Sequence, residues 1–311
     1  MFPAYINAIN STASFDQALN LVQQNLLNAN TFGYQEQRQN FVSTDFGVIP
    51  DEPQLNLESV PPAFMKGEKV TKLFISKEFN HVYFVTQSPT GSEYLTRLGD
   101  FKYTRRARDK NTYIGEPNEE RTYLTTRDGY YVIGQPIGKG PLLQDKRYQD
   151  PYSNPSYDYL GKFPIFADEK QLNPDEPYQY GPPVPIDLTR DKNGLVLGRY
   201  REVRFNSSGV LEGFRGGVWV PLYKVSLVTV DNPQGLAQVN TVYRQETEES
   251  GLRKAAPDTV QVRPETVEKS NVTPRLSSYT YKKYRWSLNL ALSLQRSNNR
   301  LMEAFQQVLS S

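Results

Sequence analysis

The stretch LVQQNLLNANTFGYQEQR, residues 21–38, ends a helical pattern and starts a different kind of chain. Apolar side chains recur at helical spacing as far as Leu26, and a polar run then interrupts the pattern. Asn30 and Thr31 precede Gly33, a residue that can adopt the left-handed conformation of a helix cap. We therefore predict that a helix ends at Gly33.

Upstream of this point, residues 4–32 contain no glycine and no proline. At about 1.5 Å per residue, a helix of this length would extend roughly 42 Å. Asp16 is the one charged residue before Glu36, so the helix should be nearly uncharged. One face has a period close to that of a coiled coil and consists of Tyr5, Ile9, Thr12, Phe15, Leu19, Val22, Leu26 and Ala29.

A second helical pattern occupies the C-terminal end of the sequence. Thr273 can cap its start, and Pro274 is tolerated at the first helical position. One seam advances in steps of three and four through Tyr281, Tyr284, Leu288, Ala291, Gln295, Asn298, Met302, Phe305 and Leu309. A second row, which widens the apolar face, consists of Leu290, Leu294, Leu301 and Val308. An isolated amphipathic helix is marginally stable in water, so we predict that the terminal helices form a coiled-coil pair.

Between the helices the hydrophobic period changes to that of strands. Residues 34–70 are polar and contain four prolines, which favours an extended connector. Residues 71–271 contain short runs of Val, Tyr, Phe and Thr separated by turn residues, which indicates an all-β domain, either a sandwich or an open barrel. Residues 244–271 are polar and are expected to be irregular. The predicted class is therefore α+β, with a helical domain of residues 1–33 and 272–311.

A long insertion is predicted at residues 136–185, which hold ten of the 22 prolines and six tyrosines. Proline disfavours both ordinary helix and central strand, so we expect neither in this segment. Insertions of this length are usually functional or mobile. A tolerated surface loop and a binding element both remain open.

Composition excludes several classes of function. The formal net charge is +2, from 36 basic and 34 acidic residues, and gives no bulk attraction to nucleic acid or anionic lipid. With no cysteine and the single histidine His81, disulfides, thiolate chemistry and zinc sites of the usual His and Cys ligands are not expected. No run approaches 18 apolar residues, so we expect no membrane insertion. The start lacks the basic and apolar regions of a Sec-type signal peptide.

Five short motifs occur along the chain in order: Asn25–Tyr34 (NLLNANTFGY), Tyr94–Phe101 (YLTRLGDF), Leu124–Tyr130 (LTTRDGY), Asn232–Leu236 (NPQGL) and Val267–Val272 (VEKSNV). The first is similar to the signature Asn-Asn-Leu-Ala-Asn-x-x-Thr-x-Gly-aromatic, and the last to Glu-x-Ser-Asn-Val ahead of a C-terminal helix. Together they resemble the axial proteins of the bacterial flagellum, the basal-body rod and hook family.

The resemblance implies a structural subunit whose terminal helices form a hollow inner tube around an export channel, with the β domain as an outer layer. It implies export by the flagellar type III secretion apparatus, without a cleaved signal peptide, into the periplasm-spanning rod. Expected partners are other copies in a helical homo-oligomer, other rod and hook proteins, the export apparatus and surrounding ring or bushing proteins. The connector YQEQRQNF, residues 34–41, and the chain length favour a rod subunit, with a hook subunit as the alternative.

The seams and motifs together define a candidate assembly interface. Its residues are Tyr5, Ile9, Phe15, Leu19, Val22, Leu26, Asn28, Asn30, Thr31, Gly33, Asn271, Leu288, Ala291, Gln295, Asn298, Met302, Phe305 and Leu309. We expect no catalytic residue, cofactor or metal. The alternatives are a self-contained two-helix hairpin, a secreted adhesin that binds through residues 136–185, and a peptidoglycan-cleaving enzyme that uses a carboxylate pair. No local motif supports the last of these.

Overall fold

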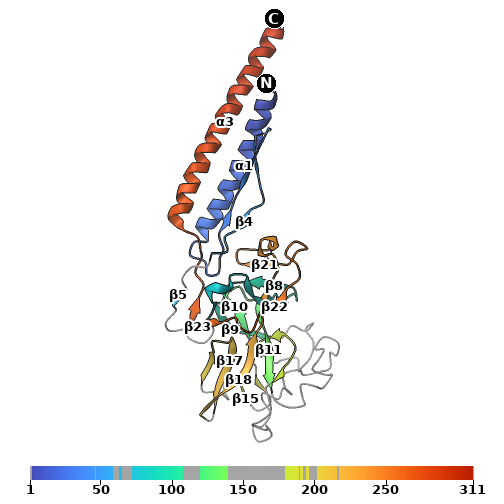
Figure 1. The fold of residues 1–311 in the computed structure, drawn as a ribbon, viewed down its shortest axis with the longest axis vertical. Helices are drawn as coiled ribbons and strands as arrows, with labels where there is room; N and C mark the ends of the chain where they lie inside the picture. Colours follow the sequence, from blue (N-terminus) through green and yellow to red (C-terminus); the bar gives the residue numbers. More distant parts are fainter. Residues whose placement is uncertain are drawn as a thin grey trace. The chain divides into compact units, whose positions relative to one another are not determined.

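The computed structural model describes residues 2–45, 47–58, 63–64, 72–107, 120–138, 179–188, 190–191, 194–195, 202–215 and 217–310. It has an N-terminal helix, a C-terminal helix and a β-rich middle, so the predicted α+β class is confirmed (Figure 1). The chain divides into a helical unit, Met1–Glu58 with Ser270–Ser311, and a β unit, Ser59–Lys269.

The N-terminal helix α1 spans Phe2–Leu27 and therefore ends earlier than the prediction at Gly33. The Asn28 side chain donates to the carbonyl of Gln24 at 2.9 Å, and Thr31 Oγ1 donates to Asn28 Oδ1 at 3.1 Å. These local bonds replace helical ones, so the chain makes tight turns after Leu27. Gly33 does have a left-handed φ of 69°, but it lies within these turns, beyond the end of the helix.

The C-terminal helix α3 spans Pro274–Ser310, and its start at Pro274 is as predicted. It lies beside α1 and runs in the opposite direction (Figure 1). Gln23 Nε2 of α1 lies 3.3 Å from the Tyr281 hydroxyl, and the rings of Phe15 and Tyr284 are 6.5 Å apart. With 37 residues against 26, α3 is longer than α1 by about 16 Å.

Residues 34–58 belong to the helical unit and are more ordered than the extended connector expected for 34–70. They form a two-stranded ribbon, hereafter the hairpin, in which β1 (Gln37–Arg38) pairs with β4 (Gln54–Leu55) and β2 (Phe41–Thr44) pairs with β3 (Gly47–Pro50). The hairpin contacts α1 through β1 and β3. Its stability comes from this contact, because an isolated two-stranded ribbon is at best marginal.

The β unit is built on one large antiparallel sheet that curls into half of a barrel. Its main strand order is β16-β17-β18-β11-β7-β8-β21-β20, and β9, β10, β12, β13, β19 and β22 pair alongside. The strand bounds are β7 Val82–Gln87, β8 Glu93–Thr96, β9 Phe101–Ala107, β10 Glu120–Thr126, β11 Tyr131–Gly138, β12 Gln179–Tyr180, β13 Val184–Pro185, β16 Glu202–Phe205, β17 Val210–Arg215, β18 Val218–Val225, β19 Leu227–Thr229, β20 Ala237–Gln238, β21 Tyr243–Gln245 and β22 Lys254–Ala255.

Smaller elements complete the unit. The paired strands are β5 (Ala63–Phe64) with β24 (Thr266–Val267), β6 (Leu73–Ile75) with β23 (Val262–Pro264), and β14 (Arg190–Asp191) with β15 (Gly194–Leu195); the 3-10 turns are η1 (Lys77–Phe79) and η6 (Pro233–Gly235). The expectation that 244–271 is irregular was wrong for four stretches, because β21 to β24 lie there. Val262 faces Ile75 across the β23–β6 pair, so long-range pairing orders a segment of weak local pattern.

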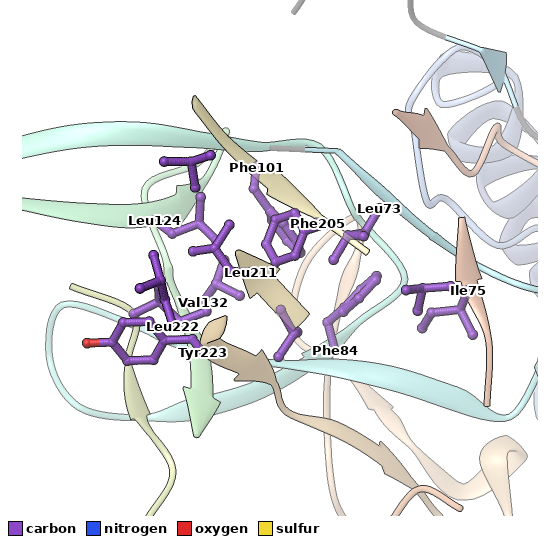
Figure 2. Packing of buried hydrophobic residues seen from close by; sticks show 14 of the residues in the cluster. Leu73, Ile75, Phe84, Phe101, Leu124, Val132, Phe205, Leu211, Leu222 and Tyr223 are labelled. Atoms are coloured by element: carbon purple, nitrogen blue, oxygen red, sulfur yellow. The ribbon is translucent and has the colours of Figure 1, made fainter. Parts of the chain in front are cut away.

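The core of the β unit gathers apolar side chains from strands distant in sequence (Figure 2). Phe84 and Phe101 are at most 1% exposed and meet edge to face at 5.2 Å. Leu124, Leu211 and Leu222 are fully buried in the same cluster. Each such side chain contributes roughly 1.5–3 kcal/mol through removal from water.

The insertion predicted at 136–185 begins and ends in strands, which corrects its bounds. β11 continues through Gly138, where it pairs with β12, and β13 also pairs with β11. Pro136 fits this strand because its carbonyl still accepts from the Gly181 amide at 2.8 Å. Residues 139–178, the greater part of the predicted insertion, lie outside the described residues.

Candidate assembly interface

α1 is covered by α3 and by the hairpin. Among its predicted interface residues, Leu19 and Val22 are buried within the subunit, and Ile9 is 39% exposed. The half-buried ones are Tyr5, Phe15 and Leu26. Most side chains of this predicted α1 seam are therefore buried or half-buried by contacts within one subunit.

The most deeply buried row on α1 consists of small or polar side chains: Ala8, Ser14, Ala18 and Asn25. Ser14 Oγ lies 2.7 Å from the carbonyl oxygen of Val48, so the hairpin backbone comes close to the helix. A β-carbon on Gly47 would lie 2.7 Å from the carbonyl oxygen of Asn7. The sequence analysis did not single out Ala8, Ser14 or Ala18, because it sought large apolar residues, although the run STAS at 11–14 was the available signal.

An aromatic cluster joins the three elements of the helical unit. Phe41 of the hairpin lies 5.4 Å from Phe15 of α1 and 5.4 Å from Tyr284 of α3, measured between ring centroids. The Tyr284 hydroxyl also lies 3.5 Å from the carbonyl of Gln39. Burial raises the pKa of the Tyr284 phenol. Aromatic contacts of this kind add about 0.5–1.5 kcal/mol each beyond the area they bury.

Asn25 holds the start of the hairpin against α1. Its Oδ1 accepts from the Tyr34 hydroxyl at 2.8 Å and from the Gln37 amide at 3.1 Å. Its Nδ2 donates to the Gln37 carbonyl at 2.7 Å. Both Asn25 and Tyr34 are at most 3% exposed. The first motif therefore encodes a contact within the subunit.

Asn271 performs a similar task from the other end of the chain. Its Oδ1 accepts from the Glu36 amide at 2.6 Å, and its Nδ2 donates to the carbonyls of Asn56 and Glu58 at 2.7 and 2.9 Å. The buried Glu36 carboxylate accepts from Asn56 Nδ2 and pairs with Arg38. Asn271, predicted as an interface residue, thus joins the last motif to the residues just before β1 and just after β4.

The other predicted interface residues of the first motif are Asn28, Asn30, Thr31 and Gly33. Asn28 and Thr31 bond to each other, and Gly33 is buried. Asn30 is exposed. Of this group, Asn30 is the residue whose side chain faces solvent.

On α3, the predicted seam divides into two parts. Its first part is buried or half-buried and consists of Leu288, Ala291, Gln295 and Asn298. Its second part is exposed: Met302 by 38%, Phe305 by 50% and Leu309 by 86%. Every described side chain from 299 to 309 is exposed, so the last three turns of α3 present apolar groups to solvent.

The second predicted row of α3 also faces solvent. With three further residues it forms a line along the outer face: Leu276, Tyr279, Trp286, Leu290, Leu294, Leu301 and Val308, all between 49% and 72% exposed. Soluble monomers rarely expose a continuous apolar stripe of this length, and such stripes mark interaction surfaces. None of these seven residues belongs to the seam that the sequence predicted as the interface.

Other sites in the described residues offer little chemistry. No group of three or more potential metal ligands occurs among them, and none of their helices is long and apolar enough for a membrane span. A depression of about 530 Å³ in the β unit is lined by both apolar and polar residues, among them Val225, Gln135 and Ser226. Its rim charges pair with each other, Lys224 with Asp258 and Arg253 with Glu93.

A scan against protein-family models found no match for the chain, and a search of curated proteins also found none.

Proposed function

We propose that the protein is a structural subunit of the bacterial flagellar rod. In this proposal α1 and α3 pair as a coiled coil and assemble with other copies into a hollow helical tube that transmits torque and encloses the export channel. The subunit reaches the rod through the flagellar type III apparatus without a cleaved signal peptide. It neighbours other rod and hook proteins, and the predicted insertion of residues 136–185 supplies contacts to surrounding rings or a bushing.

The exposed apolar end of α3 carries the proposal. Met302, Phe305 and Leu309 continue the seam that is covered by α1 earlier in the helix, yet they face solvent in the single chain. Covering them in an assembly would contribute roughly 0.5–2 kcal/mol each, after allowance for the area already buried. A patch that meets a different patch on the next copy, with a rotation that does not close, produces a filament.

Serine substitutions at the exposed seam test the assembly. Phe305→Ser with Leu309→Ser removes apolar area without adding charge, whereas Gln306→Ser with Gln307→Ser shortens polar neighbours in the same turns. We expect the first pair to abolish polymers in sedimentation and electron microscopy and the second pair to retain them. Equal polymerisation by both pairs would contradict the proposed role of the helix end.

Location tests the flagellar assignment itself. Isolated basal bodies should contain this chain, and immunogold labelling should place it along the rod. A label on the hook would select the alternative member of the same family. Absence of the chain from basal bodies would reject both.

A further inference from the structure

The outer face of α3 carries two parallel stripes. The apolar stripe consists of Leu276, Tyr279, Trp286, Leu290 and Leu294, all about half or more exposed. The basic stripe, displaced around the helix by about 100°, consists of Arg275, Lys282, Arg285, Arg296 and Arg300, all exposed. A partner for this face should therefore combine apolar groups with negative charge.

The hairpin presents a surface with this complementary chemistry. Val42 and Ile49 are directly opposed in the β2–β3 register and are 50% and 40% exposed. The exposed acids Asp45, Asp51 and Glu52 lie in the turn of the hairpin and just after β3. We name these five residues the acidic hairpin face.

Although the total charge is nearly balanced, acidic and basic side chains are separated within the helical unit. Residues 1–58 contain six acidic side chains and one basic side chain, Arg38, whereas residues 270–311 contain six basic side chains and one acidic side chain, Glu303. In the described part of the chain, no acid of the acidic hairpin face forms an ion pair with the basic stripe. Both surfaces are therefore available to a partner.

We propose that the acidic hairpin face of one copy docks on the outer face of α3 of the next copy. Val42 and Ile49 would cover part of the apolar stripe, while the hairpin acids lie against the basic stripe. The two patches are different surfaces of one subunit, so the contact is heterologous and repeats without closing. This inference rests on the proposed self-assembly and adds the identity of the lateral contact.

Opposite charges also make the contact selective and sensitive to salt. Complementary potentials steer association and fix the register of two surfaces, and salt screens them when they are exposed. We expect the protein concentration required for assembly to rise about tenfold between about 0.05 M and about 0.5 M salt. An assembly threshold that is independent of salt would contradict an electrostatic contact.

A charge exchange tests the pairing directly. One variant carries Asp45→Lys, Asp51→Lys and Glu52→Lys; the other carries Lys282→Glu, Arg285→Glu and Arg296→Glu. All six side chains are exposed, so both variants should fold, as circular dichroism can verify. Each variant alone repels its own copies and should remain monomeric, whereas an equimolar mixture should form polymers in which the two variants alternate.

The possible outcomes separate this inference from the proposed function. The inference is wrong if the wild type assembles and either variant also polymerises normally alone, or if the mixture of variants stays monomeric. The rod proposal stands in both cases. Absence of the chain from basal bodies rejects the rod proposal instead. A last experiment measures binding of the wild type and the variants to vesicles of anionic phospholipid. If the variant with the substituted basic stripe loses vesicle binding and the mixture fails to polymerise, α3 faces a membrane surface and the inference is wrong.

Cysteine cross-linking locates the contact, because the natural chain contains no cysteine. A chain with Ile49→Cys and Trp286→Cys should form disulfide-linked ladders between copies under oxidation. The matched control joins Trp286→Cys with Val239→Cys, which is 43% exposed in the β unit, and should remain uncross-linked. Equal ladders from both chains would overturn the inference.

Discussion

Arg97 and Glu268 form a buried ion pair in which Arg97 Nε donates to Glu268 Oε2 across 2.6 Å. Arg97 Nη1 also donates to the carbonyls of Phe79 and Val82, so the guanidinium organises several backbone segments at once. The pair joins the segment after β8 to the end of the β unit, 171 residues later. The motif YLTRLGDF thus contributes Arg97, whose buried side chain holds several segments of the β unit together.

Removing Arg97 should therefore strongly destabilise the β unit. Arg97→Met removes the guanidinium that faces the buried Glu268 carboxylate, and we expect a loss of about 3–5 kcal/mol in the free energy of unfolding. Lys254→Met, which breaks an ion pair whose two side chains are each 63% exposed, should cost less than about 1 kcal/mol. Urea titrations followed by Trp219 fluorescence, in proteins that carry Trp286→Phe, measure both values. Similar losses for the two variants would contradict the structural role of Arg97.

Replacing Asn271 should loosen the hairpin from its helical support. Asn271→Ala leaves the amide of Glu36 and the carbonyls of Asn56 and Glu58 without their side-chain partner, which should cost about 1–3 kcal/mol. Hydrogen exchange should accelerate at the Glu36 amide and be unchanged in Asn289→Ala, whose side chain is exposed on α3. Unchanged exchange at Glu36 in the first variant would show that Asn271 does not hold this strand.

The helices and most large strands were predictable because their stability follows from periodic burial, which a local pattern reports. Pro274 marks the start of α3, and the runs of β-branched and aromatic residues in β7, β11 and β18 indicated strands correctly. The hairpin was not recognisable as an ordered element, since it depends on Asn271, 235 residues from its partner Glu36. Likewise β23 is ordered by pairing with β6 and has little pattern of its own.

The candidate site was predictable in outline and incomplete in detail. The apolar period identified Met302, Phe305 and Leu309 on α3, because exposure of a regular apolar row follows from the length of the helix. It gave no weight to Asn25 or Phe41, whose roles arise from contacts that only the folded chain creates. Motif matching predicted contacts between subunits for Asn271, and it did not foresee the bonds that Asn271 makes within one subunit.

Alkaline pH should weaken the β unit through Tyr243. Burial, together with nearby Asp128, raises the pKa of the Tyr243 phenol well above its ordinary value of 10.0. Above pH 10 the folded state therefore keeps the proton that the unfolded state releases. The contribution of Tyr243 to the free energy of unfolding is fully present below pH 10 and is lost as the pH rises further. Each such group contributes a slope of about 1.4 kcal/mol per pH unit in that range.

Tyr243→Phe tests this dependence. At neutral pH the variant should lose about 1 kcal/mol, because the hydroxyl donates to Thr126 Oγ1 at 2.6 Å. Above pH 10 its stability should fall less steeply than that of the wild type, as measured by urea titrations. Tyr180→Phe, at a side chain that is 53% exposed, should keep the wild-type slope. Equal slopes for all three proteins would contradict the assignment to Tyr243.

Gly47 should be essential for the contact between the hairpin and α1. Its φ of +102° disfavours any side chain, and a β-carbon there would lie 2.7 Å from the Asn7 carbonyl oxygen. Gly91 has a similar φ of +96°, but a β-carbon there would have no other atom within 4 Å, so Gly91→Ala measures backbone strain alone. We expect Gly91→Ala to cost about 1–2 kcal/mol and Gly47→Ala clearly more. Thermal unfolding of both variants provides the comparison.

Hydrogen exchange should reveal which part of α3 becomes protected only when other copies bind. In the monomer, amides around Ala18 and Val22 of α1 lie under covered side chains and should exchange slowly. Residues 299–309 are exposed on all sides of the helix, and helical turns without tertiary contacts open readily, so their amides should exchange fast. On polymerisation these amides should become protected, since the apolar side chains then lie against neighbouring copies. Strong protection of 299–309 in dilute monomer would contradict this prediction, because it would show that the helix end is stable without neighbouring copies.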